Sequence, residues 1–242
     1  MAQTAYFTPA SFQFLRDLAR HNDKEWFARH KPQYEERVRG PALRLIADLA
    51  APLAGISPHL VANPRPVGGS LFRIHRDTRF SKDKSPYKTH VGMSFYHAAT
   101  KATARGDAGN AAPGRLDAPG FYLHVQPGES FIGGGLWHPQ PQTVQRVRQY
   151  MLNNPASWKK ATRARPFTRH YALDGDSLVR PPPGYDPQHE LIVDIKRKDF
   201  VATSRLTEAE LCAPGLVRRV TARYAALAPM IDWLCGALDL EF

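Results

Sequence analysis

The middle of the chain alternates between hydrophobic and polar residues. From position 71 to 138 the period is close to two, which predicts β-strands at 71–77, 87–97, 120–127 and 130–137. The first three strands each have one apolar face and one polar face, and each polar face carries a histidine. An antiparallel sheet with one covered face and one face exposed to water produces this pattern.

The N-terminal third has the spacing of amphipathic helices. A hydroxyl followed by proline at Thr8 and Pro9 predicts the start of a first helix. Asn22 is the expected cap of a second helix, with Glu25 three residues later as in a capping box. Prolines at positions 32 and 41 each remove a helical hydrogen-bond donor, so we expect breaks or kinks there.

The C-terminal third adds further helices and one strand. Helices are expected over 141–152 and from Asn154 onward, and a strand over 198–203. A capping box at Thr207 precedes a final helix over 217–238, whose apolar residues recur every three or four positions. This stripe predicts a long helix that packs against the core.

These elements predict one α+β domain spanning residues 1–242. Its mainly antiparallel sheet is expected to be covered on one face by the N-terminal helices and the long C-terminal helix. Residues 98–119 are rich in Ala and Gly and have almost no large apolar side chains. We therefore expect them to form a flexible insertion.

Composition favours an acidic partner. The 242 residues are 43% hydrophobic, enough for a sizeable core, and carry a net charge of +11. Such an excess favours nucleic acid, nucleotides, an anionic membrane surface or polyanionic substrates, and the alternative is a basic protein whose charge is spread over its surface. The chain has no apolar run long enough to span a bilayer and no secretory pattern. We therefore expect no membrane partner. Its two cysteines form no CxxC pair, which favours reduced cysteines in a cytoplasmic protein. The sequence leaves the oligomeric state open.

The positive charge concentrates in residues 73–90. This stretch is expected to be a strand, a loop over 78–86 and a second strand. Asp77 and Asp83 offset only two of its six cations, so the stretch suggests an anion site, above all for phosphate. Alternatively, the two carboxylates bind the arginines in an internal structural network. The six cations are Arg73, Arg76, Arg79, Lys82, Lys84 and Lys88.

The polar face of the predicted sheet supplies the other candidate ligand-binding residues. These are His75, Asp77, His90, Tyr122 and His124, which alternation places on the same side as Arg73 and Lys88. Imidazole and carboxylate groups can bind a metal or carry protons. No HExxH motif, CxxC motif or tight cluster with ligand spacing is present, so no metal ligand, cofactor or catalytic residue is assigned. The same alternation places the apolar residues on the covered side: Phe72, Ile74, Val91, Met93, Leu123 and Val125.

Three consecutive glycines, residues 133–135, interrupt the fourth strand. Glycines inside a strand indicate a bulge or a close approach of another backbone. A phosphate cradle is the alternative, but the spacing matches neither a P-loop nor a dinucleotide-binding fingerprint.

Four segments together resemble the signature of an uncharacterised family called domain of unknown function 2461. They are residues 71–89 (LFRIHRDTRFSKDKSPYKT), 22–27 (NDKEWF), 133–139 (GGGLWHP) and 182–185 (PPGY). The resemblance covers nearly the whole chain and implies a single-domain member of that family. It implies no activity, cofactor or catalytic residue.

The leading functional expectation is binding of a phosphate-bearing ligand through the basic segment, with nucleic acid ahead of small nucleotides. One alternative is a metal-assisted phosphoester hydrolase that uses His75 and Asp77. Another is a protein-interaction module in which the arginines and aspartates only hold the loop together. Salt-dependent affinity favours the first, and metal-dependent turnover favours the second.

Overall fold

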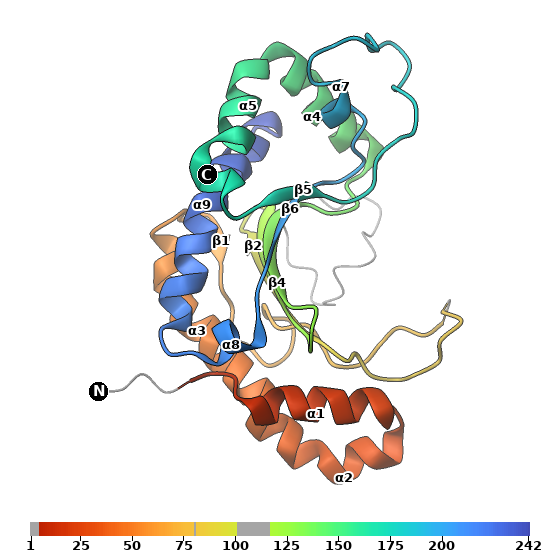
Figure 1. The fold of residues 1–242 in the computed structure, drawn as a ribbon, viewed down its shortest axis with the longest axis vertical. Helices are drawn as coiled ribbons and strands as arrows, with labels where there is room; N and C mark the ends of the chain where they lie inside the picture. Colours follow the sequence, from red (N-terminus) through yellow and green to blue (C-terminus); the bar gives the residue numbers. More distant parts are fainter. Residues whose placement is uncertain (1–4, 80, 101–116) are drawn as a thin grey trace.

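A computed structural model describes residues 5–79, 81–100 and 117–242 of the chain (Figure 1). At its centre is an antiparallel sheet of six strands in the order β1-β2-β3-β4-β6-β5. The strands are β1 (Leu60–Val61), β2 (Val91–His97), β3 (Gly120–Val125), β4 (Phe131–Leu136), β5 (Ala172–Asp174) and β6 (Phe200–Arg205). The expected α+β class and antiparallel sheet are confirmed.

The helices lie before the sheet, within its long connection from β4 to β6, and after it. The first group is α1 (Pro9–Arg20), α2 (Lys24–Tyr34), the π-helix η1 (Glu35–Arg39) and α3 (Gly40–Ala54). The second is α4 (Pro141–Asn153), α5 (Pro155–Arg163), α6 (Arg165–Thr168) and α7 (Ile192–Ile195), and the last is α8 (Glu208–Cys212) and α9 (Leu216–Ala237). No helix in the described ranges is long and apolar enough to cross a membrane.

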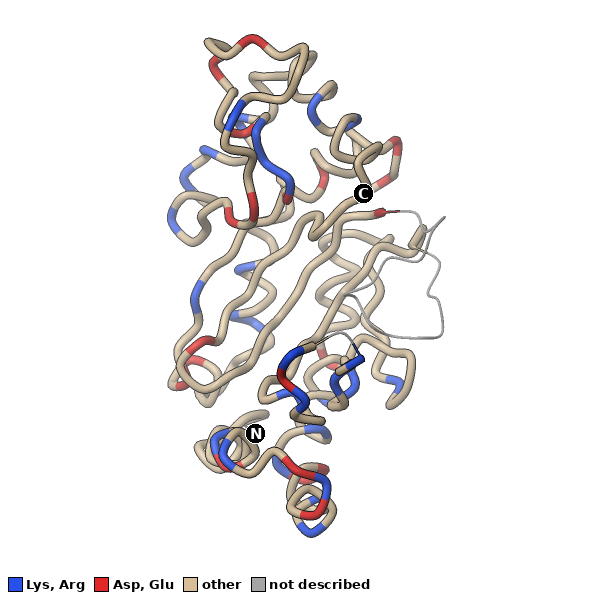
Figure 2. The backbone as a smooth tube through the Cα atoms, turned by 90° about the vertical axis from the view of Figure 1, so that its right-hand side faces the viewer, with Lys and Arg blue, Asp and Glu red and all other residues tan. Residues whose placement is uncertain are grey.

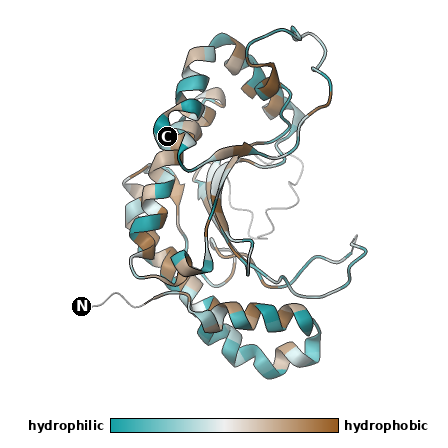
Figure 3. Ribbon diagram, in the orientation of Figure 1, coloured by the Kyte–Doolittle hydropathy of each residue, from teal (hydrophilic) through white to brown (hydrophobic). Residues whose placement is uncertain are grey.

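Helices α3 and α9 lie on one side of the sheet, as expected (Figure 1). The buried ring of Tyr224 on α9 stacks on Phe121 of β3 at a centroid distance of 4.3 Å. It also meets Phe95 of β2 edge-on, at 5.8 Å. Hydrophobic and hydrophilic residues mix along α9, as expected for a helix with one face against the sheet (Figure 3). The opposite face of the sheet, here called the open face, carries the polar residues of β2 and β3.

The start of α2 differs from the sequence prediction. Asp23, not Asn22, is the cap, and its carboxylate accepts a hydrogen bond from the Trp26 N–H. The Asn22 amide instead donates to the Tyr87 carbonyl at 2.9 Å and accepts from the Tyr87 N–H at 3.0 Å. A side-chain amide can donate to the carbonyl and accept from the N–H of the same residue, whereas an ionised carboxylate can only accept. This pairing ties α2 to the basic segment.

The prolines at positions 32 and 41 do not end the helices. Helix α2 runs through Pro32 into η1, and α3 follows directly. The Gly40 N–H reaches back to the Glu35 carbonyl, the wide hydrogen bond of a π-turn. Pro41 lies in the first turn of α3, where a missing donor costs little.

The predicted strand at 71–77 is wrong. This stretch makes only isolated bridges, Leu71 to Met93 and His75 to Tyr87, and the regular strand begins at Val91 rather than at position 87. Because the backbone pairs only intermittently, its side chains do not follow the alternation of a strand. Phe72, expected on the covered face, lies beside Tyr122 of the open face, with ring centroids 5.8 Å apart.

The three glycines of β4 are a close approach and not a bulge. Their pairing with β3 and β6 is regular on both sides. A Cβ atom on Gly134 would lie 2.6 Å from the Gly120 carbonyl oxygen and 3.2 Å from Cδ2 of Leu227 on α9. Glycine at this position therefore allows α9 to pack closely on the sheet.

The expected flexible insertion at 98–119 lies mostly outside the described residues.

We expect Gly134→Ala to lower the free energy of unfolding by roughly 1–3 kcal/mol, because the added methyl group overpacks the contact between β3, β4 and α9. Urea denaturation measures this change. Gly55→Ala is the matched control, because its Cβ would make only ordinary contacts, the nearest at 3.4 Å. Equal stability of the two variants would contradict the importance of the close approach.

Candidate functional site

A cavity of about 770 Å³ occupies the open face of the sheet. This volume lies in the range of sites for small organic ligands. Its floor comes from the strand positions that point away from α3 and α9. They include Tyr96, Tyr122, His124, Phe131, Gly133 and Thr203.

The floor is polar but almost uncharged. The only charged residues in the six strands are Asp174 of β5 and Arg205 of β6. Figure 2 faces the open side and shows uncharged strands, with charged residues gathered at their two ends. Lys88 and Asp77 of the basic segment line the cavity, as do Asp117 and Asp174. The expected polar face is therefore present, but its charges lie at the margins.

A chain of hydrogen bonds fixes the protonation of His124. The Gln126 amide nitrogen lies 2.9 Å from the Glu129 carboxylate, so its oxygen faces the His124 Nε2 at 2.8 Å and accepts from it. The His124 Nδ1 is then the acceptor for the Tyr122 hydroxyl, at 3.1 Å. Burial lowers the pKa of His124 and raises the pKa of Tyr122 to about 12. Both side chains are neutral at pH 7.

His90 extends this neutral surface. Its ring lies 4.4 Å from that of His124, centroid to centroid. Burial lowers the pKa of His90 to about 4, and the nearby His124, Lys88 and Arg76 act in the same direction. His124 also stacks on Phe131 at 4.8 Å. The floor thus presents neutral aromatic and imidazole rings side by side.

The buried carboxylate of Asp199 fixes the backbone at one rim of the cavity. Asp199 is fully buried and accepts hydrogen bonds from the backbone N–H groups of His138, at 2.7 Å, and Asp176, at 2.8 Å. His138 has a left-handed backbone, with φ of 48°. Its ring lies 4.3 Å from that of Trp137, which is 58% exposed. Asp199 therefore fixes the backbone that carries an exposed tryptophan at the rim.

The basic loop contains the internal network that was the alternative to an anion site. The Arg76 guanidinium binds Asp83 and the Ser85 hydroxyl, and Arg79 binds both oxygens of Asp77, at 2.9 Å and 2.6 Å. The bond to Arg79 lowers the pKa of Asp77 to about 2. Hydrogen bonds from Ser85 and then Arg76 lower that of Asp83.

The three lysines of the segment differ in their contacts. Lys84 donates to the Thr78 carbonyl at 2.9 Å. Lys88 donates to the Arg73 carbonyl at 3.1 Å and lies over the Phe72 ring. Lys82 is exposed. The segment is held together by its own side chains and still presents cations to solvent.

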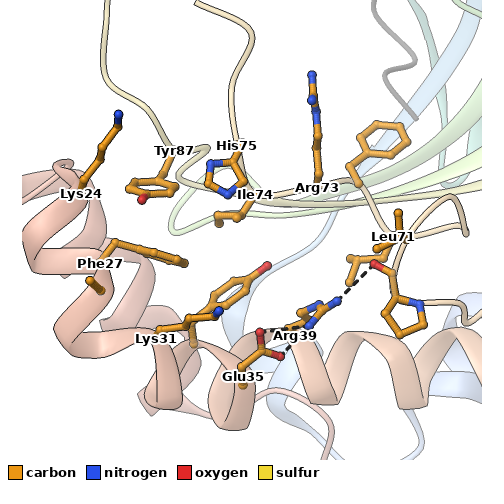
Figure 4. A pocket seen from close by; sticks show the side chains of 15 residues that line it. Lys24, Phe27, Lys31, Glu35, Arg39, Leu71, Arg73, Ile74, His75 and Tyr87 are labelled. Atoms are coloured by element: carbon orange, nitrogen blue, oxygen red, sulfur yellow. Dashed lines mark hydrogen bonds and ion pairs between the residues drawn. The ribbon is translucent and has the colours of Figure 1, made fainter. Parts of the chain in front are cut away.

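Arg73 and His75 do not join the open-face residues. They line a second hollow, between α2 and the segment 66–75 (Figure 4). The His75 ring lies 5.1 Å from that of Tyr87. His75 lines this second hollow, whereas Asp77 lines the open-face cavity. The residues that do come together are Asp77, Lys88, His90, Tyr122 and His124.

Several lining residues were missed from the sequence, chiefly Phe72, Phe131, Trp137 and Thr203. Phe131 and Trp137 flank the glycine run, which drew attention only as a backbone feature. Within the described ranges, no group of three or more His, Cys, Asp or Glu side chains is arranged to hold a metal ion.

The fold and cavity define an α+β protein with a one-sided antiparallel sheet whose open face holds a neutral, aromatic cavity. A family model described as "Conserved hypothetical protein (DUF2461)" matches residues 10–233, and the chain belongs to that family. No curated protein and no solved structure matches the chain.

Burial of His90 gives stability a defined pH dependence. Its pKa is about 6.5 in the unfolded chain and about 4 in the fold, so the unfolded chain takes up the proton first as pH falls. The free energy of unfolding should therefore decrease from about pH 6.5 to about pH 4. In His90→Gln this decrease should be smaller by on the order of 1–2 kcal/mol.

Urea unfolding at several pH values across this window measures the difference. His21→Gln removes an exposed imidazole on the α1–α2 connection and serves as the control. If His90→Gln and His21→Gln show the same pH dependence, the His90 ring is not desolvated.

Proposed function

We propose that this protein binds a nucleotide-bearing ligand, and single-stranded nucleic acid in particular, across the open face of the sheet. The observation that supports this most directly is a neutral aromatic cavity that lies next to a cation-rich segment. Bases need stacking surfaces and phosphates need cations, and the two kinds of group are neighbours here.

The cavity floor suits the flat face of a base. Tyr122, His124 and Phe131 lie within ring-contact distance of one another, between 4.8 and 6.0 Å. Stacking on such rings tolerates any base, because every base has a π-face. The neutral state of His124 avoids the cost of burying a charge beneath the ligand.

The phosphates would meet the basic segment. Residues 73–88 hold six cations and two carboxylates, and the whole chain carries +11. Asp77 and Asp83 order Arg79 and Arg76, so part of the positive charge maintains the loop conformation. Lys82, Lys84 and Lys88 supply point charges for a flexible polyanion.

The internal network favours a second candidate, a protein-interaction module in which the basic loop has only a structural role. Two arginine–aspartate pairs within one short loop are the observation for it. Both candidates agree with a cytoplasmic location, which the unpaired cysteines favour.

A fluorescein-labelled oligonucleotide of roughly 12 nucleotides tests the proposal by fluorescence anisotropy over a series of salt concentrations. Affinity should fall as salt rises. Phe131→Ala should weaken binding roughly tenfold with an unchanged salt slope, because it removes a stacking surface. Lys88→Gln should weaken binding and reduce the slope by about 1.

Arg146→Gln is the charge-matched control. It removes one cation from α4 that pairs with Asp239, away from the cavity lining. Thermal melts establish that each variant is folded. Equal effects of Lys88→Gln and Arg146→Gln, or full affinity in Phe131→Ala, would reject the open face as the binding surface and favour the interaction module.

A further inference from the structure

The second hollow, between α2 and the segment 66–75, has the features of a separate ligand site. Its volume is about 440 Å³, and Phe72 is the one residue that appears in both linings among the described residues. Figure 4 shows Phe27 and Tyr87 side by side at one end and Arg39 with Glu35 at the other. The hollow is therefore distinct from the open-face cavity.

The walls of this hollow are apolar and partly aromatic. Phe27 and Tyr87 stack at 4.1 Å, and the Tyr34 ring lies 5.4 Å from Phe27. Leu71 and Ile74 add aliphatic surface from the opposite side. This composition suits the flat hydrocarbon body of a small ligand.

Tyr34 provides an unused hydrogen-bond donor in this lining. The residue is 7% exposed, and its hydroxyl has no hydrogen-bond partner within the described part of the chain. Burial raises the pKa of Tyr34 to about 12, so the phenol keeps its proton at pH 7 and can donate a hydrogen bond to an acceptor. Because the Tyr34 side chain lines the hollow, its hydroxyl can donate a hydrogen bond to a ligand oxygen there.

The charges around the hollow are positive. Lys24 and Lys31 lie on the lined face of α2, at three- and four-residue spacing with Phe27 and Tyr34. Neither lysine has an ion-pair partner in the described ranges. The single acid of the lining, Glu35, is neutralised by Arg39, with N–O distances of 3.0 Å and 2.9 Å. An anionic group is thus favoured here over a cationic one.

We propose that this hollow binds a small planar aromatic carboxylate. Its ring system lies between the aromatic wall of Phe27 and Tyr87 and the aliphatic side chains of Leu71 and Ile74. Its carboxylate accepts the Tyr34 hydroxyl proton in a hydrogen bond and lies near the Lys31 ammonium group. This site does not depend on nucleic-acid binding at the open face.

Isothermal titration calorimetry with 2-naphthoate tests the proposal on the full chain, with uncharged 2-naphthamide as a second probe. The wild type should bind the naphthoate more tightly than the amide. Tyr34→Phe removes only the hydroxyl and should weaken naphthoate binding roughly tenfold, because a hydrogen bond to a charged group is lost. Lys31→Gln should weaken it roughly threefold, as expected for an exposed charge.

Two controls separate this site from other binding. Lys160→Gln removes an exposed cation from α5 and should leave the affinity unchanged. Phe131→Ala alters the open-face cavity and should also leave it unchanged, so a failure of the nucleic-acid proposal does not affect this result. Undetectable naphthoate binding, equal binding of the amide, or wild-type affinity in a folded Tyr34→Phe variant would overturn the assignment.

Discussion

The packing of α9 against β3 and β4 is the contact on which the rest of the structure depends. A Cβ atom on residue 134 would lie only 3.2 Å from Cδ2 of Leu227, and Tyr224 stacks on Phe121. This contact buries one face of the sheet, and because successive side chains of a strand point to opposite faces, every second side chain lies on the other face. The open-face cavity follows from that one-sided burial, because its floor consists of the residues that α9 and α3 do not cover.

On the open face, the neutral rings and the charged side chains occupy different places. Neutral rings occupy the middle, where burial lowers the pKa values of His90 and His124, and charges remain at the ends of the strands. The hydrogen-bond chain from Glu129 through Gln126 and His124 to Tyr122 assigns each proton. A ligand that meets this surface would find a defined set of donors and acceptors and no buried charge to desolvate.

The basic segment links the two hollows. Phe72, directly before the segment, lies in both linings, Arg73 and His75 line one hollow and Asp77 and Lys88 the other, and Asn22 ties the segment to α2 at Tyr87. A change in this backbone would alter both linings together. The arginine–aspartate pairs therefore help to hold the backbone that shapes the cavities, in addition to setting the charge beside them.

The sequence alone determined the elements whose signals are local. The alternation in β3, the stripe of α9 and the capping box at Thr207 each depend on neighbouring residues, and each was found as expected. The sheet's apolar face in β2 and β3 was predictable for the same reason. The expected family also followed from contiguous motifs.

Only the tertiary structure decided which residues meet. Residues 71–77 have the alternation of a strand, but a strand also needs a partner backbone along its length, and here the pairing is intermittent. As a result His75 and Asp77, two positions apart, line different hollows, and Phe72 lies on the open face. Periodicity specifies how side chains alternate along one segment, whereas their final neighbours depend on long-range backbone pairing that no local pattern encodes.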